Sequence, residues 1–283
     1  MASFAEIMVP SRLGRLKLRV AGQGSTLLFW PSLLMDGSMW LDIAERFADR
    51  YRVVLIDPPG HGDSERLDRG FDFTSCADCV LDILDALQLE RAHFIGNSWG
   101  AMIGGTFAAR HPARLGVAVL MNGTATPCNS RQRLEFTALI WLGRLLRGIR
   151  GPLVTRAVRA FLGPTSLRER PQAVAAVRAA LARVDFRSVR WAVDSVVPRR
   201  PDQRSLFASI HTPVLVIAGA EDPTFPVAET REMAEAIPDA HFTVMPGVAH
   251  LAGLECPHEV YLIIAQFIQA YEQKPGPECS FSN

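Results

Sequence analysis

The segment Gly96-Asn97-Ser98-Trp99-Gly100 has the pattern Gly-x-Ser-x-Gly and lies between a short apolar run, residues 92–95, and a run with helical spacing, residues 99–110. This order predicts a strand, a tight turn and a helix. Such a turn holds its central serine in a strained backbone conformation, and the glycines on both sides let the strand and the helix approach each other. The hydroxyl of Ser98 would then stand clear of the backbone, close to the first free N–H groups of the helix. Ser98 is therefore the candidate nucleophile.

The composition predicts a globular protein with one large core. The chain has 283 residues, a formal net charge of +1 and 48% hydrophobic residues, which suffices for an α/β core with an inserted subdomain. It has no run of about 18 uncharged apolar residues, and its first residues lack the basic and then apolar layout of a secretory signal. We therefore expect a cytoplasmic protein without stable membrane anchoring.

The five cysteines are expected to be free thiols, because their number is odd and their spacing matches no disulfide framework. Cys76 and Cys79 form a C-x-x-C pair within a helical pattern. No second pair accompanies them, which disfavours a metal or redox site. No other group of His, Cys and Asp in the sequence has metal-ligand spacing, so we expect no bound metal.

Short apolar runs alternate with segments of helical spacing along most of the chain, which implies a parallel sheet. The runs that predict strands are residues 7–9, 16–20, 26–30, 52–56, 92–95, 115–121, 214–218 and 241–245. The segments that predict helices around these strands are residues 36–50, 74–87, 99–110, 227–237 and 257–271. The first two runs are expected to form a hairpin. Residues 272–283 are polar and expected to fray.

Residues 126–205 interrupt this alternation with helical patterns punctuated by Gly and Pro. We expect a helical insertion here, with the core formed by residues 1–125 and 206–283. The insertion carries 16 Arg, no Lys and 5 acidic residues, a balance of +11, whereas the remainder has 14 basic and 24 acidic residues, a balance of −10. The Arg residues either face solvent and complement the acidic body, or attract an anionic substrate or surface.

A serine hydroxyl needs a base within hydrogen-bond reach and a third group that orients this base. Among the seven histidines, His250 is the candidate base, because its loop follows the last predicted strand, at the sheet edge where Ser98 emerges. His61, in a loop rich in Pro and Gly, and His111, at the end of a helix, are weaker candidates.

The orienting acid should also follow the end of a strand. Asp222 meets this requirement in the segment Ala218-Gly-Ala-Glu-Asp-Pro-Thr-Phe225. The neighbouring Glu221 is chemically suitable but needs a shift of one residue in the loop.

These features together resemble the α/β-hydrolase family over nearly the whole chain. They are the elbow around Ser98, the order Ser98, Asp222, His250, the loop Asp57-Pro-Pro-Gly-His-Gly-Asp-Ser64 and the helical insertion after the sixth strand. Within the family, Gly-Asn-Ser-x-Gly, Arg110-His-Pro-Ala-Arg114 and His250-Leu-Ala-Gly-Leu-Glu-Cys-Pro257 resemble β-ketoadipate enol-lactonases and hydrolases of meta-cleavage products.

The resemblance implies an α/β-hydrolase fold with a mostly parallel sheet of about eight strands, a helical cap over the pocket, and hydrolysis without a metal or organic cofactor. Some relatives place the acid after the sixth strand, where this chain has Asn122-Gly123 and no carboxylate. That leaves Asp222. A Ser rather than an Asp nucleophile argues against dehalogenase or epoxide hydrolase chemistry.

The chain departs from the family in the segment Phe29-Trp-Pro-Ser-Leu33, where relatives usually carry His-Gly directly after the strand. Pro31 has no N–H and cannot donate to an oxyanion. When the oxyanion-hole positions of the family are carried over residue by residue, the first donor is the backbone N–H of Trp99. The second is the backbone N–H of Ser32, or that of Leu33 if the loop shifts by one residue.

The substrate pocket is expected to be apolar. Trp30 would form one wall, and Leu139 and Trp141 in the insertion would contribute to another. Trp40 and Trp99 are further candidates for the pocket. An equally good alternative is that Trp30, Trp40 and Trp99 fill the core of the protein.

The expected activity is hydrolysis of a small or medium-sized carboxylic ester or lactone through an acyl-enzyme, in the manner of a carboxylesterase or lactonase. One alternative is a C–C bond hydrolase of the meta-cleavage type that uses the same three residues. The other is a receptor of the same fold that binds a small molecule without catalysis. We expect no nucleic-acid partner, and the sequence leaves the oligomeric state open.

Overall fold

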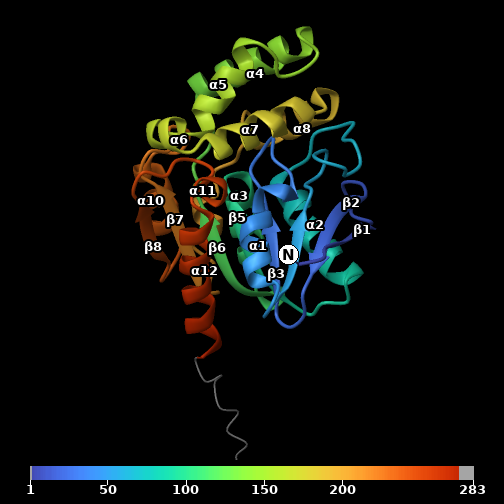
Figure 1. Ribbon diagram of the computed structural model, residues 1–283, viewed down its shortest axis with the longest axis vertical. Coiled ribbons are helices and arrows are strands. Elements are labelled where there is room, and N and C mark those ends of the chain that lie inside the picture. The colour runs from blue at the N-terminus through green and yellow to red at the C-terminus, as the bar shows by residue number, and fades with distance from the viewer. Residues whose placement is uncertain (1, 274–283) are drawn as a thin grey trace, which may run out of the picture.

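A sheet of eight strands forms the centre of the structure, a computed structural model that describes residues 2–273 (Figure 1). The strands are β1 (Ala5–Val9), β2 (Leu16–Ala21), β3 (Thr26–Trp30), β4 (Arg52–Ile56), β5 (Ala92–Asn97), β6 (Leu115–Met121), β7 (Val214–Gly219) and β8 (His241–Met245). Their spatial order is β1-β2-β4-β3-β5-β6-β7-β8. The pairs β1·β2 and β2·β4 are antiparallel, and all other pairs are parallel. The predicted mostly parallel sheet of eight strands is confirmed, as is the leading hairpin.

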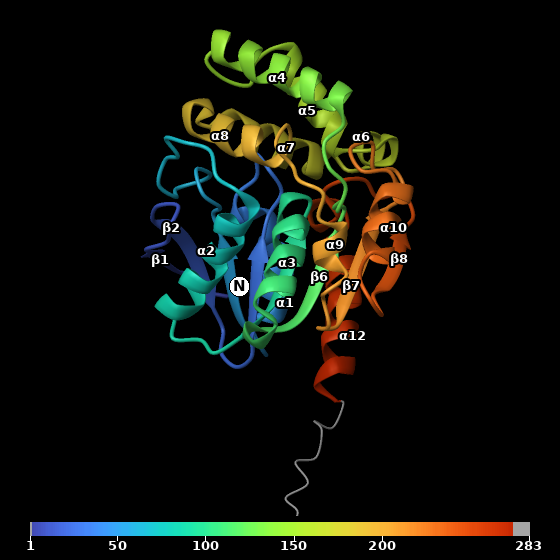
Figure 2. The same cartoon turned by 180° about the vertical axis from the view of Figure 1, so that it is seen from behind.

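Helices cover both faces of this sheet, as Figures 1 and 2 show from opposite sides. The helices that flank the sheet are α1 (Leu41–Phe47), α2 (Phe73–Ala86), α3 (Trp99–Arg110), α10 (Val227–Glu235) and α12 (Pro257–Glu272), with the short elements η1 (Gly37–Trp40), η2 (Pro112–Arg114), α9 (Arg204–Phe207) and α11 (Ala252–Glu255). Successive side chains of a strand point to opposite faces. In β3, Leu28 and Trp30 therefore join the cluster on the side of α2 and α3, whereas Leu27 and Phe29 join the cluster on the side of α1 and α12.

Five helices lie over the edge of the sheet where the parallel strands end, and we call them the upper helices (Figures 1 and 2). They are α4 (Ser130–Leu145), α5 (Pro152–Phe161), α6 (Pro164–Glu169), α7 (Pro171–Arg183) and α8 (Phe186–Val196). They form two layers: α6, α7 and α8 lie next to the sheet edge, and α4 and α5 lie above α8 and α7. The segment without strands that the sequence predicts is thus helical.

The chain leaves the sheet for the upper helices and returns at nearly the same place. The backbone N–H of Gln203 donates to the carbonyl of Ala125 at 2.8 Å. Arg200 Nε donates to the carbonyl of Thr126 at 2.8 Å, and the N–H of Cys128 donates to the carbonyl of Arg200 at 3.4 Å. The two connecting segments therefore lie side by side and are joined by hydrogen bonds.

Two helix predictions need correction. The helix predicted over residues 36–50 is split into η1 and α1, because the side chain of Asp36 accepts from the N–H of Ser38 and the backbone of Trp40 (φ −105°, ψ 0°) leaves helical values. The helix α12 continues to Glu272, where fraying was expected, and residues 274–283 lie outside the described part of the chain.

Candidate active site

Three strand ends meet at the sheet edge beneath the upper helices (Figure 1). Ser98 follows β5 directly, Asp222 lies three residues after β7, and His250 lies five residues after β8. Because β5, β7 and β8 run in the same direction, their carboxyl ends share this edge. The topology therefore brings together the three residues that the sequence singled out.

Ser98 occupies a strained turn between β5 and α3. Its backbone has φ 57° and ψ −111°, a region that residues with side chains rarely adopt. A Cβ atom at Gly96 would lie 2.3 Å from the backbone of Gly100, and a Cβ atom at Gly100 would lie 2.3 Å from the carbonyl oxygen of Trp30. The two glycines are therefore required by close backbone contacts, as the sequence pattern predicts.

His250 is bonded to Asp222. Its Nδ1 lies 2.8 Å from Asp222 Oδ2, and Asp222 Oδ1 accepts the N–H groups of Thr224 and Phe225 at 2.8 and 3.1 Å. Glu221 points elsewhere, because its carboxylate accepts the N–H and the hydroxyl of Thr165 on α6. These hydrogen bonds lower the pKa of Glu221. Of the two acids that the sequence left open, the structure joins Asp222 to the histidine.

Two asparagines hold the backbone of His250 against the elbow. Asn97 Nδ2 donates to the carbonyl of His250 at 2.7 Å, and Asn122 Nδ2 donates to the same carbonyl at 2.9 Å. Asn122 also accepts the N–H of Gly219 at 2.7 Å, which ties in the end of β7. Among the described residues, Ser98 Oγ and His250 Nε2 form no direct hydrogen bond. They are held as neighbours through Asn97, which precedes Ser98 in the chain.

Glu255 is a residue of the site that the sequence analysis missed. Its carboxylate accepts the N–H groups of Ala249 and Leu251, the two neighbours of His250, at 3.0 Å each. It also accepts the hydroxyl of Ser166 on α6. Burial raises the pKa of this carboxyl, and its hydrogen bonds oppose that rise. A charged residue five positions after His250 in an otherwise apolar stretch was the available signal.

The predicted oxyanion donors lie around the elbow. Among the described residues, the backbone N–H groups of Trp99, Ser32 and Leu33 have no hydrogen-bond acceptor. The hydroxyl of Ser32 accepts Asn97 Nδ2 at 2.7 Å, which places the loop after β3 against the elbow. An oxyanion between these groups would find donors that are already free.

His61 supports this loop rather than acting as a base. Its Nε2 accepts the N–H of Leu34 at 3.1 Å, and its Nδ1 lies 3.0 Å from the carbonyl of Pro59. Burial lowers the pKa of His61 to about 4. The ring is therefore neutral near pH 7, and both nitrogens are occupied. His111, the other weak candidate, pairs with Asp78 on α2 at 2.7 Å.

The tryptophans near the elbow fill the core. Trp30 and Trp99 have no exposed surface, and their rings meet edge to face at 5.6 Å. Phe71 stacks on the other side of Trp99 at 5.9 Å. Trp40 is also fully buried but packs on Phe29, at the opposite face of the sheet. The expectation that Trp30 walls the pocket therefore needs correction.

The structure also places Leu139 and Trp141 away from the site. Both lie on α4, in the layer of upper helices farther from the sheet (Figure 1), and Trp141 is 64% exposed. The helix α4 contacts α8 instead of the sheet edge. The aromatic rings beside His250 are Phe161, stacked at 5.7 Å, and Phe225, tilted at 5.6 Å. Phe161 ends α5 and is the direct contribution of the upper helices.

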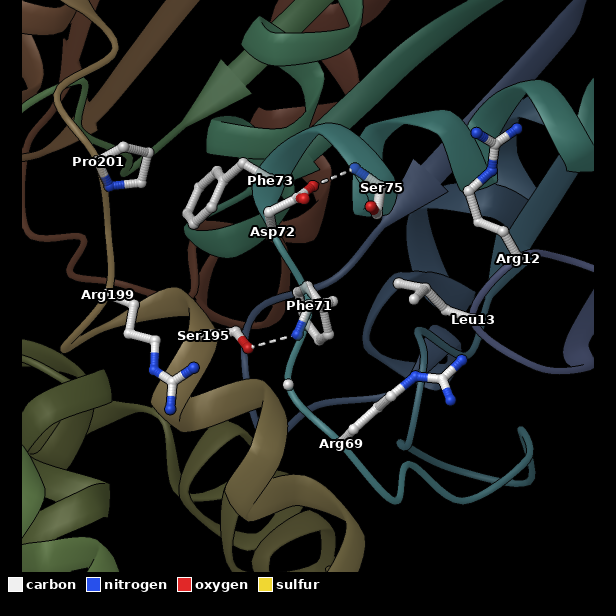
Figure 3. Close-up of a pocket in the computed structure, with 11 residues that line it drawn as sticks. Arg12, Leu13, Arg69, Phe71, Asp72, Phe73, Ser75, Ser195, Arg199 and Pro201 are labelled. Carbon is white, nitrogen blue, oxygen red and sulfur yellow. Dashed lines mark hydrogen bonds between the residues drawn. The ribbon is translucent and has the colours of Figure 1, made fainter.

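Two cavities open between the upper helices and the loops of the core. The larger, of about 600 Å³, lies where α8 meets the loop before α2, and Figure 3 shows Phe71 and Ser195 on its wall. The smaller, of about 260 Å³, is lined by His61 and by Leu34, which belongs to the loop directly after β3 that carries Ser32 and Leu33 and that we call the oxyanion loop. Neither lining includes Ser98 or His250, which are only 7% and 1% exposed. The upper helices therefore cover the three strand-end residues closely.

The fold is that of an α/β hydrolase. The chain belongs to the alpha/beta hydrolase fold family, whose profile matches residues 25–257. Within residues 2–273, no group of three or more His, Cys, Asp or Glu side chains is arranged to hold a metal ion.

Relatives of this chain include enzymes that cleave esters and lactones. The 3-oxoadipate enol-lactonase 1 of Acinetobacter baylyi is 26% identical over 279 residues, which are 96% of this chain and 100% of the relative. The pimeloyl-[acyl-carrier protein] methyl ester esterase of Chromobacterium violaceum is 26% identical over 265 residues, which are 88% of this chain and 96% of the relative. The structure of a thermophilic esterase from Thermogutta terrifontis has a TM-score of 0.86 at 23% identity over 95% of this chain and 99% of its own, and shares the fold. Family and relatives support ester hydrolysis in general.

Proposed function

We propose that this chain is a cofactor-independent serine hydrolase that cleaves a carboxylic ester or lactone through an acyl-enzyme. Ser98 is the nucleophile, His250 the base and Asp222 the orienting acid. The observation that carries the proposal is the 2.8 Å pair of His250 Nδ1 and Asp222 Oδ2, held beside the strained elbow by Asn97. A histidine oriented by a carboxylate beside a serine hydroxyl is the arrangement that nucleophilic catalysis requires.

The hydrogen bonds at the site support a reaction in two stages. Asp222 accepts from Nδ1 and so keeps the proton of the neutral ring there, which leaves Nε2 free to take the proton of Ser98. The alkoxide attacks the acyl carbon, and the N–H groups of Trp99 and of Ser32 or Leu33 stabilise the oxyanion. His250 then protonates the leaving alcohol. Water, activated by the same histidine, releases the acid and restores Ser98.

The surroundings of His250 favour an uncharged substrate with an apolar body. Phe161 and Phe225 flank the ring, and desolvating a charged group beside them would cost free energy without a partner charge. An ester or lactone presents a polar carbonyl for the oxyanion donors and apolar groups for the phenyl rings. This is the substrate class that we propose.

We also propose that residues 126–205 act as a cap on a core formed by residues 1–125 and 206–283. The adjacent ends of this segment support the division, as does the position of the upper helices over the sheet edge. The ring of Phe161 stacks on that of His250, and the carbonyl of Phe161 accepts the N–H of His250. The cap therefore completes the site and has to move for substrate to reach it.

The test is a comparison of wild type with Ser98→Ala on a panel of lactones, esters and vinylogous diketones. We expect ester or lactone turnover that falls by roughly 10³- to 10⁶-fold in the variant, with the fold retained. A fluorophosphonate should label wild type and not the variant. Ser205→Ala, at an exposed serine of the same chain, is the matched control and should behave as wild type.

Three results would contradict the proposal. Near-normal turnover by Ser98→Ala would show that Ser98 is not the nucleophile. Turnover of the diketones alone would identify a C–C bond hydrolase. Binding of ligands without turnover of any activated ester would identify a receptor of the same fold.

A further inference from the structure

The helix α4 carries an apolar stripe on its outer side. Leu134, Trp141 and Leu145 are 75%, 64% and 65% exposed, and Ala138 between them is exposed as well. Separations of four, three and four residues place these side chains on one face of a helix. No other element lies above this helix in either view (Figures 1 and 2). Exposed large apolar side chains that form a continuous face indicate an interaction surface.

The neighbouring helix shows that this exposure is not general in the upper layer. In α5 the apolar residues Val158 and Phe161 are buried against the chain, and Arg156 and Arg159 face outward. In α4 only Gly143 is buried, where Phe186 of α8 packs on its backbone. The stripe of α4 thus lies on the side that has no partner among residues 2–273.

Positive charge surrounds the stripe. Residues 130–161 contain seven Arg and one acidic residue, a net charge of +6. Glu135 pairs with Arg156, and the other six Arg of this segment form no ion pair among the described residues. Arg183 and Arg204, closer to the sheet, pair instead with Asp36 and Glu232 of the body. Of the ten Arg of residues 126–205 that form no ion pair among the described residues, six therefore lie in residues 130–161.

We propose that the outer face of α4 docks reversibly on the surface of an anionic lipid bilayer. A helix that combines an apolar face containing Trp and Leu with basic flanks lies in the interface plane, its apolar side at the boundary of headgroups and acyl chains and its cations at anionic headgroups. Among residues 2–273, no helix has the length and apolar character needed to span a bilayer. The attachment is therefore peripheral. This inference stands independently of the proposed reaction.

A second copy of the chain fits this face less well. A twofold dimer would place the same surface of each copy against the other, and so bring together two segments of net charge +6. An anionic bilayer offers the opposite charge and a matching apolar interior.

The first test is sedimentation with vesicles of phosphatidylcholine, with and without phosphatidylglycerol, at low and high salt. We expect wild type to bind the vesicles that contain phosphatidylglycerol, and to release from them as salt rises. The triple variant Leu134→Ser, Trp141→Ser, Leu145→Ser should bind these vesicles at least roughly tenfold more weakly than wild type. The matched control, Met8→Ser, Leu167→Ser, Leu262→Ser, removes three exposed apolar side chains from other elements and should bind as wild type.

The second test uses Trp141 as a probe of depth. Trp30, Trp40 and Trp99 are fully buried, and Trp191 lies beneath the guanidinium of Arg190 at 3.8 Å. Brominated lipid should therefore quench the fluorescence of wild type, and Trp141→Phe should abolish the quenching while vesicle binding persists. Thermal unfolding and turnover of a short ester check that each variant is folded.

The proposal is overturned if wild type binds neither kind of vesicle, or if the triple Ser variant binds the vesicles as strongly as wild type does. Concentration-dependent dimers of wild type in sedimentation velocity, abolished by the same three Ser substitutions, would assign the face to contact between copies instead.

Discussion

The ring of His61 is bonded through both nitrogens and is almost fully buried, and these two facts decide its contribution to the protein. It links the N–H of Leu34, in the oxyanion loop, to the carbonyl of Pro59. Burial penalises the charged ring, so the pKa falls from 6.5 to about 4. The folded protein thus holds a neutral histidine where the unfolded chain would hold one that titrates normally.

The first residue-scale prediction concerns stability in acid. Because the folded-state pKa of His61 lies below its unfolded value, the unfolded chain binds the proton first as pH falls. The free energy of unfolding should be unaffected by this group above pH 6.5. It should decrease by roughly 3 kcal/mol between pH 6.5 and pH 4. Urea unfolding of wild type and His61→Gln across this range measures the effect as the difference in slope. Parallel profiles would show that His61 makes no such contribution.

The second residue-scale prediction concerns Glu255, whose carboxylate clamps both neighbours of His250. In Glu255→Gln a neutral amide replaces the carboxylate, so the hydrogen bonds from the N–H groups of Ala249 and Leu251 lose their charge assistance, which roughly halves their strength. We expect kcat to fall by roughly 10- to 100-fold with little change in KM, because the loss falls on the position of the base and not on substrate binding.

Glu259→Gln, an exposed position four residues further on, is the control for Glu255→Gln. It should retain wild-type kcat and thermal midpoint. A Glu255→Gln enzyme that loses thermal stability but keeps kcat would restrict Glu255 to a structural role.

At the scale of elements, the sequence predicted the strands well and the contacts between loops poorly. The bounds of β6 and β8 are those predicted, because unbroken apolar runs identify buried strands in a parallel sheet. The strand ends in turn located Ser98, Asp222 and His250. The roles of Asn97, Asn122 and Glu255 depend on which loops meet, which no local pattern records. For α4, the helical pattern could not tell which of its apolar sides would find α8, so Trp141 was placed in the pocket.

The elbow provides the element-scale prediction. A Cβ atom at Gly100 would lie 2.3 Å from the carbonyl oxygen of Trp30, so Gly100→Ala has to push α3 away from the oxyanion loop. Because a displacement of about 1 Å at a reacting group can cost 10²-fold, turnover should fall by at least that factor.

Gly151→Ala is the control for the elbow variant. Its Cβ atom would meet nothing within 4 Å, and the strain comes from its backbone alone, whose φ of 54° and ψ of −127° are close to those of Ser98. We expect roughly 1–3 kcal/mol of local strain without displacement of any neighbour. Steady-state kinetics and thermal midpoints of both variants separate steric displacement from backbone strain. Equal kinetics for the two would reject the close packing of elbow and loop.

At the scale of the whole molecule, the Arg residues of the basic insertion fall into two groups with different surroundings. Arg183, Arg200 and Arg204 face acidic side chains of the body and hold the two parts together. The Arg residues of α4 form no ion pair among the described residues, and α4 belongs to the layer of upper helices farther from the sheet (Figure 2). At physiological ionic strength a charge is screened beyond about 8 Å, so the outer layer contributes little field at the sheet edge.

The prediction at this scale compares two substrates that differ only in a carboxylate. We expect the uncharged member to have the higher kcat/KM, and the ratio of the two values to be the same at low and high salt, since the side chains that flank His250 are aromatic rings and not Arg residues. A large preference for the carboxylate member that disappears at high salt would show instead that the Arg residues act on the substrate.

The hydrogen bond between Ala125 and Gln203 closes the base of the insertion. This closure affects how proteins of this fold can change during evolution. A segment whose two ends already touch can be lengthened, shortened or replaced without shifting the strands that carry the reacting groups, since closing a loop of different length changes its entropy only slowly. Recombination at these two positions exchanges the whole insertion in a single event. Substrate range and surface affinity can then diverge between descendants while the strand-end chemistry is transmitted unchanged, and a chimera joined at residues 125 and 203 reproduces that event in the laboratory.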